Sequence, residues 1–168
     1  SEMCIRDRIA LMLGSVTAFA QKMDKNEVKQ LQNFLSQPAE KGGTNATALK
    51  ITDLKSPATW EGVTVANGRV TAIEWKDKHL AGDLDLSGFT ALTKVDVSRN
   101  ALTSLSVAGD AALTELNASR NKLSTLTLKD NSALRDIKVY RNRLTDIDIT
   151  GTPLLTNLNC SNNLLVEL

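Results

Sequence analysis

The stretch LTELNASRNKL at residues 113–123 decides the fold, because LRDIKVYRNRL at residues 134–144 repeats its pattern 21 residues later. The same step (113 − 92 = 21) separates neighbours in two columns of identical residues: Leu92, Leu113, Leu134 and Leu155, and Asn100, Asn121, Asn142 and Asn163. Neither the period of a helix nor that of a strand explains identity at this step. It predicts a solenoid, in which the chain completes one coil per repeat and each coil stacks on the last.

Each repeat reads L-x-x-L-x-L-x-x-N-x-L, and we number its positions from the first leucine. Apolar residues at positions 4 and 6 alternate with polar ones, which is the period of a short strand with one buried face. Strands from successive coils are expected to stack about 4.8 Å apart into a parallel sheet. The asparagine at position 9 falls where the chain leaves the sheet. Its amide can donate to and accept from buried backbone groups, which predicts an asparagine ladder at Asn100, Asn121, Asn142 and Asn163.

These repeats resemble the leucine-rich-repeat family, and the resemblance covers residues 70–168. The second half of each repeat copies the apolar pattern of the first, as in LSTLTL at residues 123–128. Its β-branched residues, among them Thr125 and Thr127, favour extended chain over helix. The chain therefore resembles the 21-residue bacterial subgroup. The predicted fold is a leucine-rich-repeat solenoid, conventionally classed α/β but mostly β in content, with a parallel sheet of stacked 21-residue coils and a small helical N-terminal cap.

Residues 21–69 precede the repeats and are predicted to form a cap over the first coil. A solenoid needs such a cap, because its first coil would otherwise expose an apolar end and an unpaired strand edge. Within this segment a helix is predicted over residues 24–36, with Asp24 as its N-cap and Glu27 completing a capping box. Residues 45–51 are expected to form a further short helical turn.

Two tryptophans mark the junction between the cap and the repeats. Trp60, in the sequence SPATWEGV, lies in a segment that resembles the N-terminal caps of extracellular leucine-rich-repeat proteins, and this resemblance implies a capping role. Trp75 falls in the position-6 column, where it is expected to close the core. The first coil, residues 70–91, is one residue longer than the others. The extra residue falls within residues 80–84, and Lys78 stands where the ladder asparagine is expected.

The N-terminal residues carry the features of an export signal. Residues 9–20 form an apolar run that ends in Ala-Phe-Ala, as before a signal-peptidase site, and the run is short for a membrane span. We therefore predict a signal peptide over residues 1–20, a mature chain without a transmembrane segment, and a location outside the cell or at its surface. Residues 1–8 are interpreted as foreign sequence, with a genuine basic n-region as the alternative. No polar cap follows Leu168, so the repeats are expected to continue in a longer protein.

Composition argues against several classes of function. A formal net charge of +1 and an aromatic content of 4% argue against a nucleic-acid-binding protein. Cys4 and Cys160 form no metal-binding or disulfide spacing, and His79 has no catalytic partners around it, so no enzyme, metal site or cofactor is expected. Asn45 and Asn117 open glycosylation sequons, which matter only in a eukaryotic secretory pathway. Four aspartates alternate with core positions and are interpreted as solvent-facing: Asp83, Asp85, Asp146 and Asp148.

The predicted sheet is the expected binding surface, because the family resemblance implies ligand binding on its concave face. Positions 3, 5, 7 and 8 are interpreted as exposed there. The candidate ligand-binding residues are Arg99, Arg120, Arg141, Tyr140, Lys138, Glu115, Asn117, Asp96 and Asn159. The arginines form a column at position 8 that could bind an anionic glycan or an acidic protein strip. The alternative is a solvated arginine row paired with Glu115, Asp136 and Asp96.

The resemblance implies a secreted or surface recognition module that binds a protein or a glycan without covalent chemistry. The alternative is a targeting or spacer module of a larger secreted enzyme or anchored surface protein, and a third reading is a structural surface-layer protein. The repeat pattern does not identify the ligand, because it fixes the platform and leaves the exposed residues free.

Overall fold

The computed structural model describes residues 22–166, so the predicted signal peptide, Cys4 and Leu168 lie outside the described residues. Within that range the chain forms a short helical region followed by strands. The elements are α2 (Lys25–Leu35), α3 (Asn45–Ala48), the 3-10 helix η1 (Pro57–Thr59), β1 (Val63–Ala66), β2 (Arg69–Glu74), β3 (Ala81–Asp85), β4 (Lys94–Asp96), β5 (Ala101–Ser106), β6 (Glu115–Asn117), β7 (Thr125–Thr127), β8 (Asp136–Lys138) and β9 (Asn157–Asn159).

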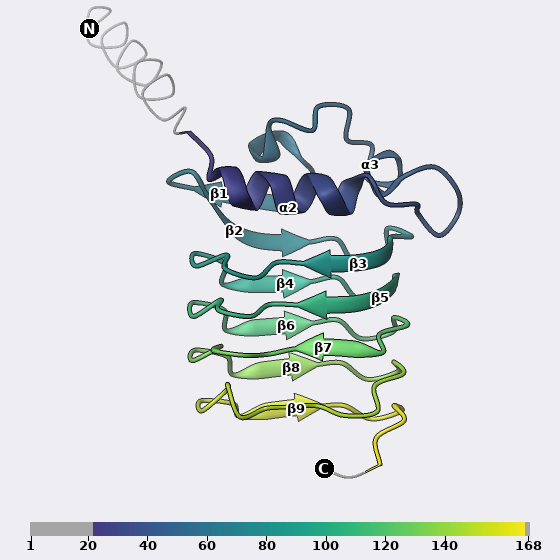
Figure 1. The fold of residues 1–168 in the computed structure, drawn as a ribbon, viewed down its shortest axis with the longest axis vertical. Coiled ribbons are helices and arrows are strands. Elements are labelled where there is room, and N and C mark those ends of the chain that lie inside the picture. Colours follow the sequence, from purple (N-terminus) through teal and green to yellow (C-terminus); the bar gives the residue numbers. More distant parts are fainter. Residues whose placement is uncertain (1–21, 167–168) are drawn as a thin grey trace, which may run out of the picture.

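The strands stack as coils of a β-solenoid (Figure 1). One sheet has the order β1-β2-β4-β6-β8-β9, and β3, β5 and β7 form a second sheet on the opposite side of each coil. Strands β2, β4, β6, β8 and β9 pair in parallel, and the pairing of β6 with β8 sets Leu116 against Ile137, one repeat apart. Only β1 pairs antiparallel to its neighbour among the described strands. The predicted solenoid of stacked 21-residue coils, with an extended second half, is confirmed.

The core is a narrow apolar column between the two sheets. Positions 1, 4 and 6 of the repeat point inward, and in the central coil Leu113, Leu116 and Ala118 are all buried. Leu123 and Leu128, from the second half of the same repeat, are buried on the opposite side of the core. A three-residue strand such as β6 places only one side chain inward, so the turn residues on either side complete the core.

The pairing of β3 with β5 contains a bulge: Gly82 pairs with Leu102 and Asp83 with Ser104, which leaves Thr103 of β5 out of the pairing. The register between β3 and β5 shifts between Gly82 and Asp83, inside the predicted segment 80–84. Gln37 faces this bulge: its side-chain Nε2 donates to the Asp83 carbonyl (2.8 Å), and its Oε1 accepts from the Asp83 amide (2.8 Å). Asn45 does the same for the amide and carbonyl of Ala81 (3.0 and 2.8 Å). Side-chain amides of the cap therefore satisfy the outer edge of β3.

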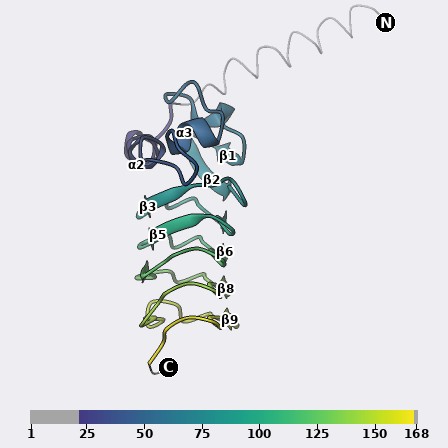
Figure 2. The ribbon, with the colours of Figure 1, turned by 90° about the vertical axis from the view of Figure 1, so that its right-hand side faces the viewer.

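Helix α2 covers the first coil (Figures 1 and 2). Asp24 caps it by accepting from the amides of Asn26 and Glu27, but the predicted capping box is wrong in its second half. The Glu27 carboxylate is buried and accepts instead from Arg69 Nε (2.7 Å) and the Val70 amide (2.9 Å), because the docked helix turns that side chain toward β2.

Both tryptophans are buried where the cap meets the solenoid. Trp75 closes the core: its ring stacks on Phe34 of α2, with centroids 5.9 Å apart, and its Nε1 donates to the Glu61 carbonyl. Trp60 donates in the same way to the Asp53 carbonyl (2.7 Å). Each indole thus buries its rings and still has a hydrogen-bond acceptor for its one polar atom.

Candidate functional site

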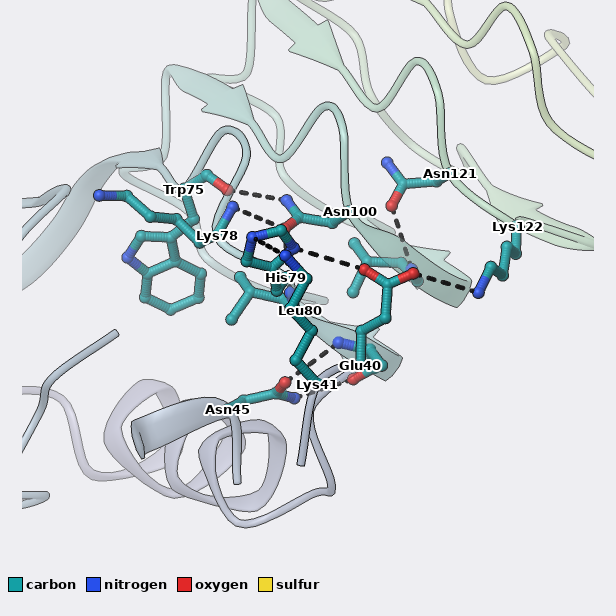
Figure 3. Close-up of polar contacts among 12 residues, drawn as sticks. Glu40, Lys41, Asn45, Trp75, Lys78, His79, Leu80, Asn100, Asn121 and Lys122 are labelled. Carbon is teal, nitrogen blue, oxygen red and sulfur yellow. Dashed lines mark hydrogen bonds and ion pairs between the residues drawn. The ribbon is translucent and has the colours of Figure 1, made fainter. Parts of the chain in front are cut away.

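The chain leaves each strand of the larger sheet through a turn that an asparagine holds together. Asn100 shows the pattern: its Nδ2 donates to the Trp75 carbonyl (2.8 Å) in the preceding coil (Figure 3) and to the Val97 carbonyl (2.9 Å) in its own. Its Oδ1 accepts from the amides of Lys78 and Leu80, both at 3.0 Å. Apart from the Lys78 bond, the corresponding bonds recur in the next three coils at Asn121, Asn142 and Asn163. The turns are therefore identical in geometry from coil to coil, which aligns the side chains just before each asparagine.

The residue before each ladder asparagine has a left-handed backbone. Arg99, Arg120 and Arg141 have φ angles of 57°, 56° and 55°. The turn requires this conformation, because it directs the amide of each arginine to a carbonyl one coil on, as from Arg99 to Ser119 (3.0 Å). These arginines thus lie in the turn at the end of each strand, not in the strand as predicted.

Arginine is not the residue that this backbone prefers. Asparagine and aspartate adopt left-handed φ at lower cost than other non-glycine residues. The same column begins with Asp77 (φ 56°) and ends with Asn162 (φ 55°), where the sequence follows that preference. In the three coils between them the residue at this position is arginine, against the preference of the backbone. The backbone alone does not account for this choice, so we attribute it to the guanidinium groups.

Positions 5 and 7 build the turn in most coils, which corrects part of the predicted binding surface. Asp96 Oδ1 accepts from both the amide (3.0 Å) and the hydroxyl (2.6 Å) of Ser98, and Ser98 is buried. The prediction that position 7 is exposed is therefore wrong for Ser98 and Ser119, which are buried, whereas Ser161 is exposed as predicted. Two further candidates, Asn117 and Asn159, make the same bonds to the serines that follow them.

One coil departs from this turn-building pair. It carries Lys138 at position 5 and Tyr140 at position 7, where the three other repeats with a ladder asparagine have an acid or amide and then a serine; the first coil has Glu74 and Lys76 there. Arg120 lies over the Tyr140 ring, with its guanidinium carbon 5.9 Å from the centroid. Hydrogen bonding to Ser119 first, and then to Arg120, lowers the pKa of the Tyr140 hydroxyl from its ordinary value. We call the following group the arginine edge: Arg99, Arg120, Arg141, Lys138 and Tyr140.

The arginine column is not neutralised by carboxylates. Among residues 22–166, none of Arg99, Arg120 and Arg141 forms an ion pair, so the pairing part of the alternative prediction is wrong; all three arginines are exposed. Two of the three acids that were predicted to pair with them have other partners: Asp136 pairs with Lys138 (3.3 Å), and Asp96 accepts from Ser98.

The central strands also line a shallow hollow on the same sheet. Its volume is about 150 Å³, and Glu115, another candidate residue, is exposed beside it. The hollow holds no apolar side chain apart from the buried strand centres Val95 and Leu116. Its walls are charged and amide side chains: Lys94, Asp96, Glu115, Asn117, Asp136 and Lys138. This surface can bind a polar ligand through hydrogen bonds and charge, whereas an apolar ligand would find no pocket in it.

His79 lies beside the cap (Figure 3). Its ring contacts Lys41 Nζ (2.9 Å) and Glu40 (3.6 Å), and its side chain is 43% exposed. The described residues contain no group of three or more metal-binding side chains and no helix long and apolar enough to cross a membrane. The sequon asparagine Asn45 is fully buried and bonded through its amide nitrogen, so the folded cap leaves it no room for a glycan.

A second polar column at the other end of the coil was not predicted. Asp110, Asn131 and Thr152 follow the 21-residue step and are all buried. Asp110 Oδ1 accepts from the Phe89 amide (2.8 Å), and Asn131 Nδ2 donates to the Val107 carbonyl (2.7 Å). The recurrence of polar residues at this step was a signal in the sequence. Because the three residues differ, the column does not stand out as the asparagines do.

A comparison with known protein families finds no model that matches the chain, and a comparison with curated proteins finds no match. The functional conclusion therefore depends on the arginine edge and on the sheet beside it.

Proposed function

We propose that this chain is a secreted or surface-exposed leucine-rich-repeat protein whose larger sheet and arginine edge bind a protein or a glycan non-covalently. It resembles the 21-residue bacterial subgroup of that family in its repeats. We further propose that it is not an enzyme and that residues 1–20 export it.

One observation carries this proposal. Three arginines occupy left-handed turn positions that favour asparagine or aspartate, and none of them has a carboxylate partner in the described chain. A residue that opposes the local backbone preference and makes no ion pair is expected where function selects its side chain. Lys138 and Tyr140 support the same location. In their coil they stand where turn-building residues are found in the neighbouring ladder coils, and their side chains are suited to binding.

Binding to arrays of surface glycans and extracellular proteins tests the proposal. The full chain is expected to bind a defined subset of them, and Arg120→Glu is expected to abolish that binding because it reverses a charge in the middle of the column. Arg143→Glu is the matched control: Arg143 is exposed in the next coil but lies beyond the ladder asparagine. If Arg120→Glu and Arg143→Glu bind every ligand as the wild type does, the sheet and its edge are not the recognition surface. A spacer or targeting module would then fit better.

A further inference from the structure

We infer, resting on the proposed recognition function, that the arginine edge binds a linear acidic glycan, whose carboxylate or sulfate groups lie along the column from coil to coil. The ligand class follows from the spacing, the charge and the polarity of this edge.

The spacing suits a polymer. Each arginine is one coil from the next, and the parallel pairing of the strands beside them sets that separation at about 4.8 Å. Because identical ladder turns hold the three backbones, the guanidinium groups start from equivalent positions. A ligand with anionic groups repeated along its length can engage all three, and binding at several points raises its apparent affinity above that of a single group.

The charge suits an anion. Guanidinium forms paired hydrogen bonds to carboxylate and sulfate oxygens, and within residues 22–166 no carboxylate occupies these three groups. Arg120 lies over the Tyr140 ring, which favours one placement of its guanidinium before the ligand arrives.

The polarity favours a glycan over a protein. Protein interfaces carry an apolar, desolvated centre in which charged residues are depleted. The outward face of the sheet here is charged or amide-bearing at every position around the central hollow, and Tyr140 is the one aromatic residue at the edge. A hydrated polymer with many hydrogen-bonding groups matches such a surface, and a tyrosine ring can pack on a sugar face.

The test measures binding of the full chain to immobilised polygalacturonate, dextran sulfate, uncharged dextran, polyglutamate and duplex DNA. The two acidic glycans separate carboxylate from sulfate as the preferred group. At least one of them is expected to bind at low salt and to weaken as salt rises, while dextran does not bind. Arg120→Gln is expected to weaken binding about tenfold, and the matched Arg143→Gln is expected to stay within about twofold of the wild type.

Each other outcome overturns the inference. Tighter binding of polyglutamate or DNA than of either glycan would make the ligand an acidic protein or a nucleic acid. Equal binding of dextran would remove the role of charge. If no polymer binds, or if Arg120→Gln and Arg143→Gln behave alike, the column does not bind acidic glycans. The array experiment above then decides separately whether the sheet recognises something else.

Asp110 supports a second and independent inference: we infer that its carboxyl group is protonated in the folded protein and takes the place of an asparagine in the second polar column. In the next coil Asn131 Nδ2 donates to the carbonyls of Val107 (2.7 Å) and Asp110 (3.3 Å). By the 21-residue step, the equivalent carbonyls for Asp110 belong to Leu86 and Phe89. Because Asp110 Oδ1 already accepts from the Phe89 amide, Oδ2 is the atom left for those carbonyls.

A protonated Oδ2 can donate to such carbonyls as Asn131 Nδ2 does, whereas an ionised Oδ2 cannot donate. Among the described residues, Asp110 Oδ2 is buried without a hydrogen-bond partner, as is Asn131 Oδ1 in the same column, so an ionised Oδ2 would be a buried charge with no donor of its own. Burial raises the pKa of Asp110 to about 8, against the two backbone amides that lower it.

The charges around Asp110 reinforce the protonated form. The carboxylates of Asp85 and Glu27 oppose its ionisation, although Arg69 binds Glu27 and offsets part of that effect. The next coil's turn contributes Lys129 and Asp130, which are exposed and of opposite sign.

The folding equilibrium of wild type and Asp110→Asn, measured by urea denaturation between pH 5 and 7, tests this inference. A carboxyl group whose folded pKa is raised stabilises the protein most at low pH, and that stability is lost as pH rises toward the folded pKa. The wild-type folding constant is therefore expected to fall, relative to that of Asp110→Asn, by about tenfold per pH unit in this window. Groups common to both proteins, such as His79, cancel in the comparison.

Parallel pH profiles for the two proteins would show that Asp110 is ionised when folded and would overturn the inference. If Asp110→Asn does not fold, infrared spectroscopy of the wild type at pH 6 decides instead. The inference requires the carbonyl band of a protonated carboxylic acid, and its absence contradicts it.

Discussion

At the turns, single side chains form hydrogen bonds with backbone amides and carbonyls that have no backbone partner. The solenoid has short strands, so much of each coil is turn, and the turns enclose backbone groups away from water. Asn121 alone serves four of them: it donates to the carbonyls of Val97 (3.0 Å), Ala118 (3.1 Å) and Ser119 (3.4 Å) and accepts from the Leu102 amide (3.0 Å). Such groups are costly when left unpaired in the interior, which explains why one asparagine per coil recurs.

We therefore expect Asn121→Leu to destabilise the protein by about 1–3 kcal/mol, because leucine keeps the volume but leaves these backbone groups unpaired. Asn33→Leu is the control, since Asn33 is exposed on α2 and leucine suits a helix at least as well. Urea denaturation of the three proteins measures the difference. Equal stability of Asn121→Leu and wild type would show that the ladder bonds contribute nothing.

At the scale of elements, the cap is joined to the solenoid by a buried acid. Glu27 of α2 is 1% exposed and holds both the Arg69 side chain and the Val70 amide at the start of β2. Helix α2 has no other charged side chain buried against the strands.

Glu27→Ala is expected to cost about 2–5 kcal/mol, because it leaves a buried amide without an acceptor and Arg69 without its closest partner. Glu40→Ala removes an exposed acid that pairs with His79 and Lys122, and it is expected to cost less than about 1 kcal/mol. Thermal denaturation of both variants compares the two. A similar small effect of both changes would mean that apolar packing alone, such as that of Phe34 on Trp75, holds the cap.

The repeating elements were predictable, and the conformation of the turns was not. Columns at a 21-residue step identify Leu113 and Asn121 as structural because only stacked coils require the same residue at the same place. The same columns predict that Arg120 and Ser119 lie on the strand face, since the sequence does not show where the alternation of buried and exposed side chains ends. The strand in fact ends at Asn117, and a left-handed residue then turns the chain. That geometry follows from the ladder hydrogen bonds between coils, which the order of residues within one repeat does not predict.

At the scale of the whole molecule, stability is expected to decrease from the cap toward the last described coil. Each coil of a solenoid contacts only its neighbours. At the cap the core is sealed by Trp75, whereas apolar side chains of the last coils are partly exposed: Ile149 43%, Leu154 46%, Leu164 61% and Val166 84%.

Native-state hydrogen exchange of the 168-residue chain measures this gradient. The Leu164 amide, bonded to the Leu144 carbonyl in the last coil, is expected to exchange faster than the Lys122 amide, bonded to the Leu102 carbonyl in the middle of the stack. Equal protection of the two amides would show that the stack opens as one unit.

The central claim is that the arginines of the edge are retained for binding against the preference of their own backbone. The most direct measurement is the free energy of unfolding of Arg99→Asn, because it needs no ligand and Arg99 lacks the tyrosine contact that Arg120 makes. We expect this variant to be more stable than wild type by about 0.5–1 kcal/mol, since asparagine suits the left-handed turn. Arg143→Asn, at a position without left-handed φ, is expected to gain nothing. A loss of stability in Arg99→Asn beyond that of Arg143→Asn would contradict the claim, because arginine would then serve the fold itself.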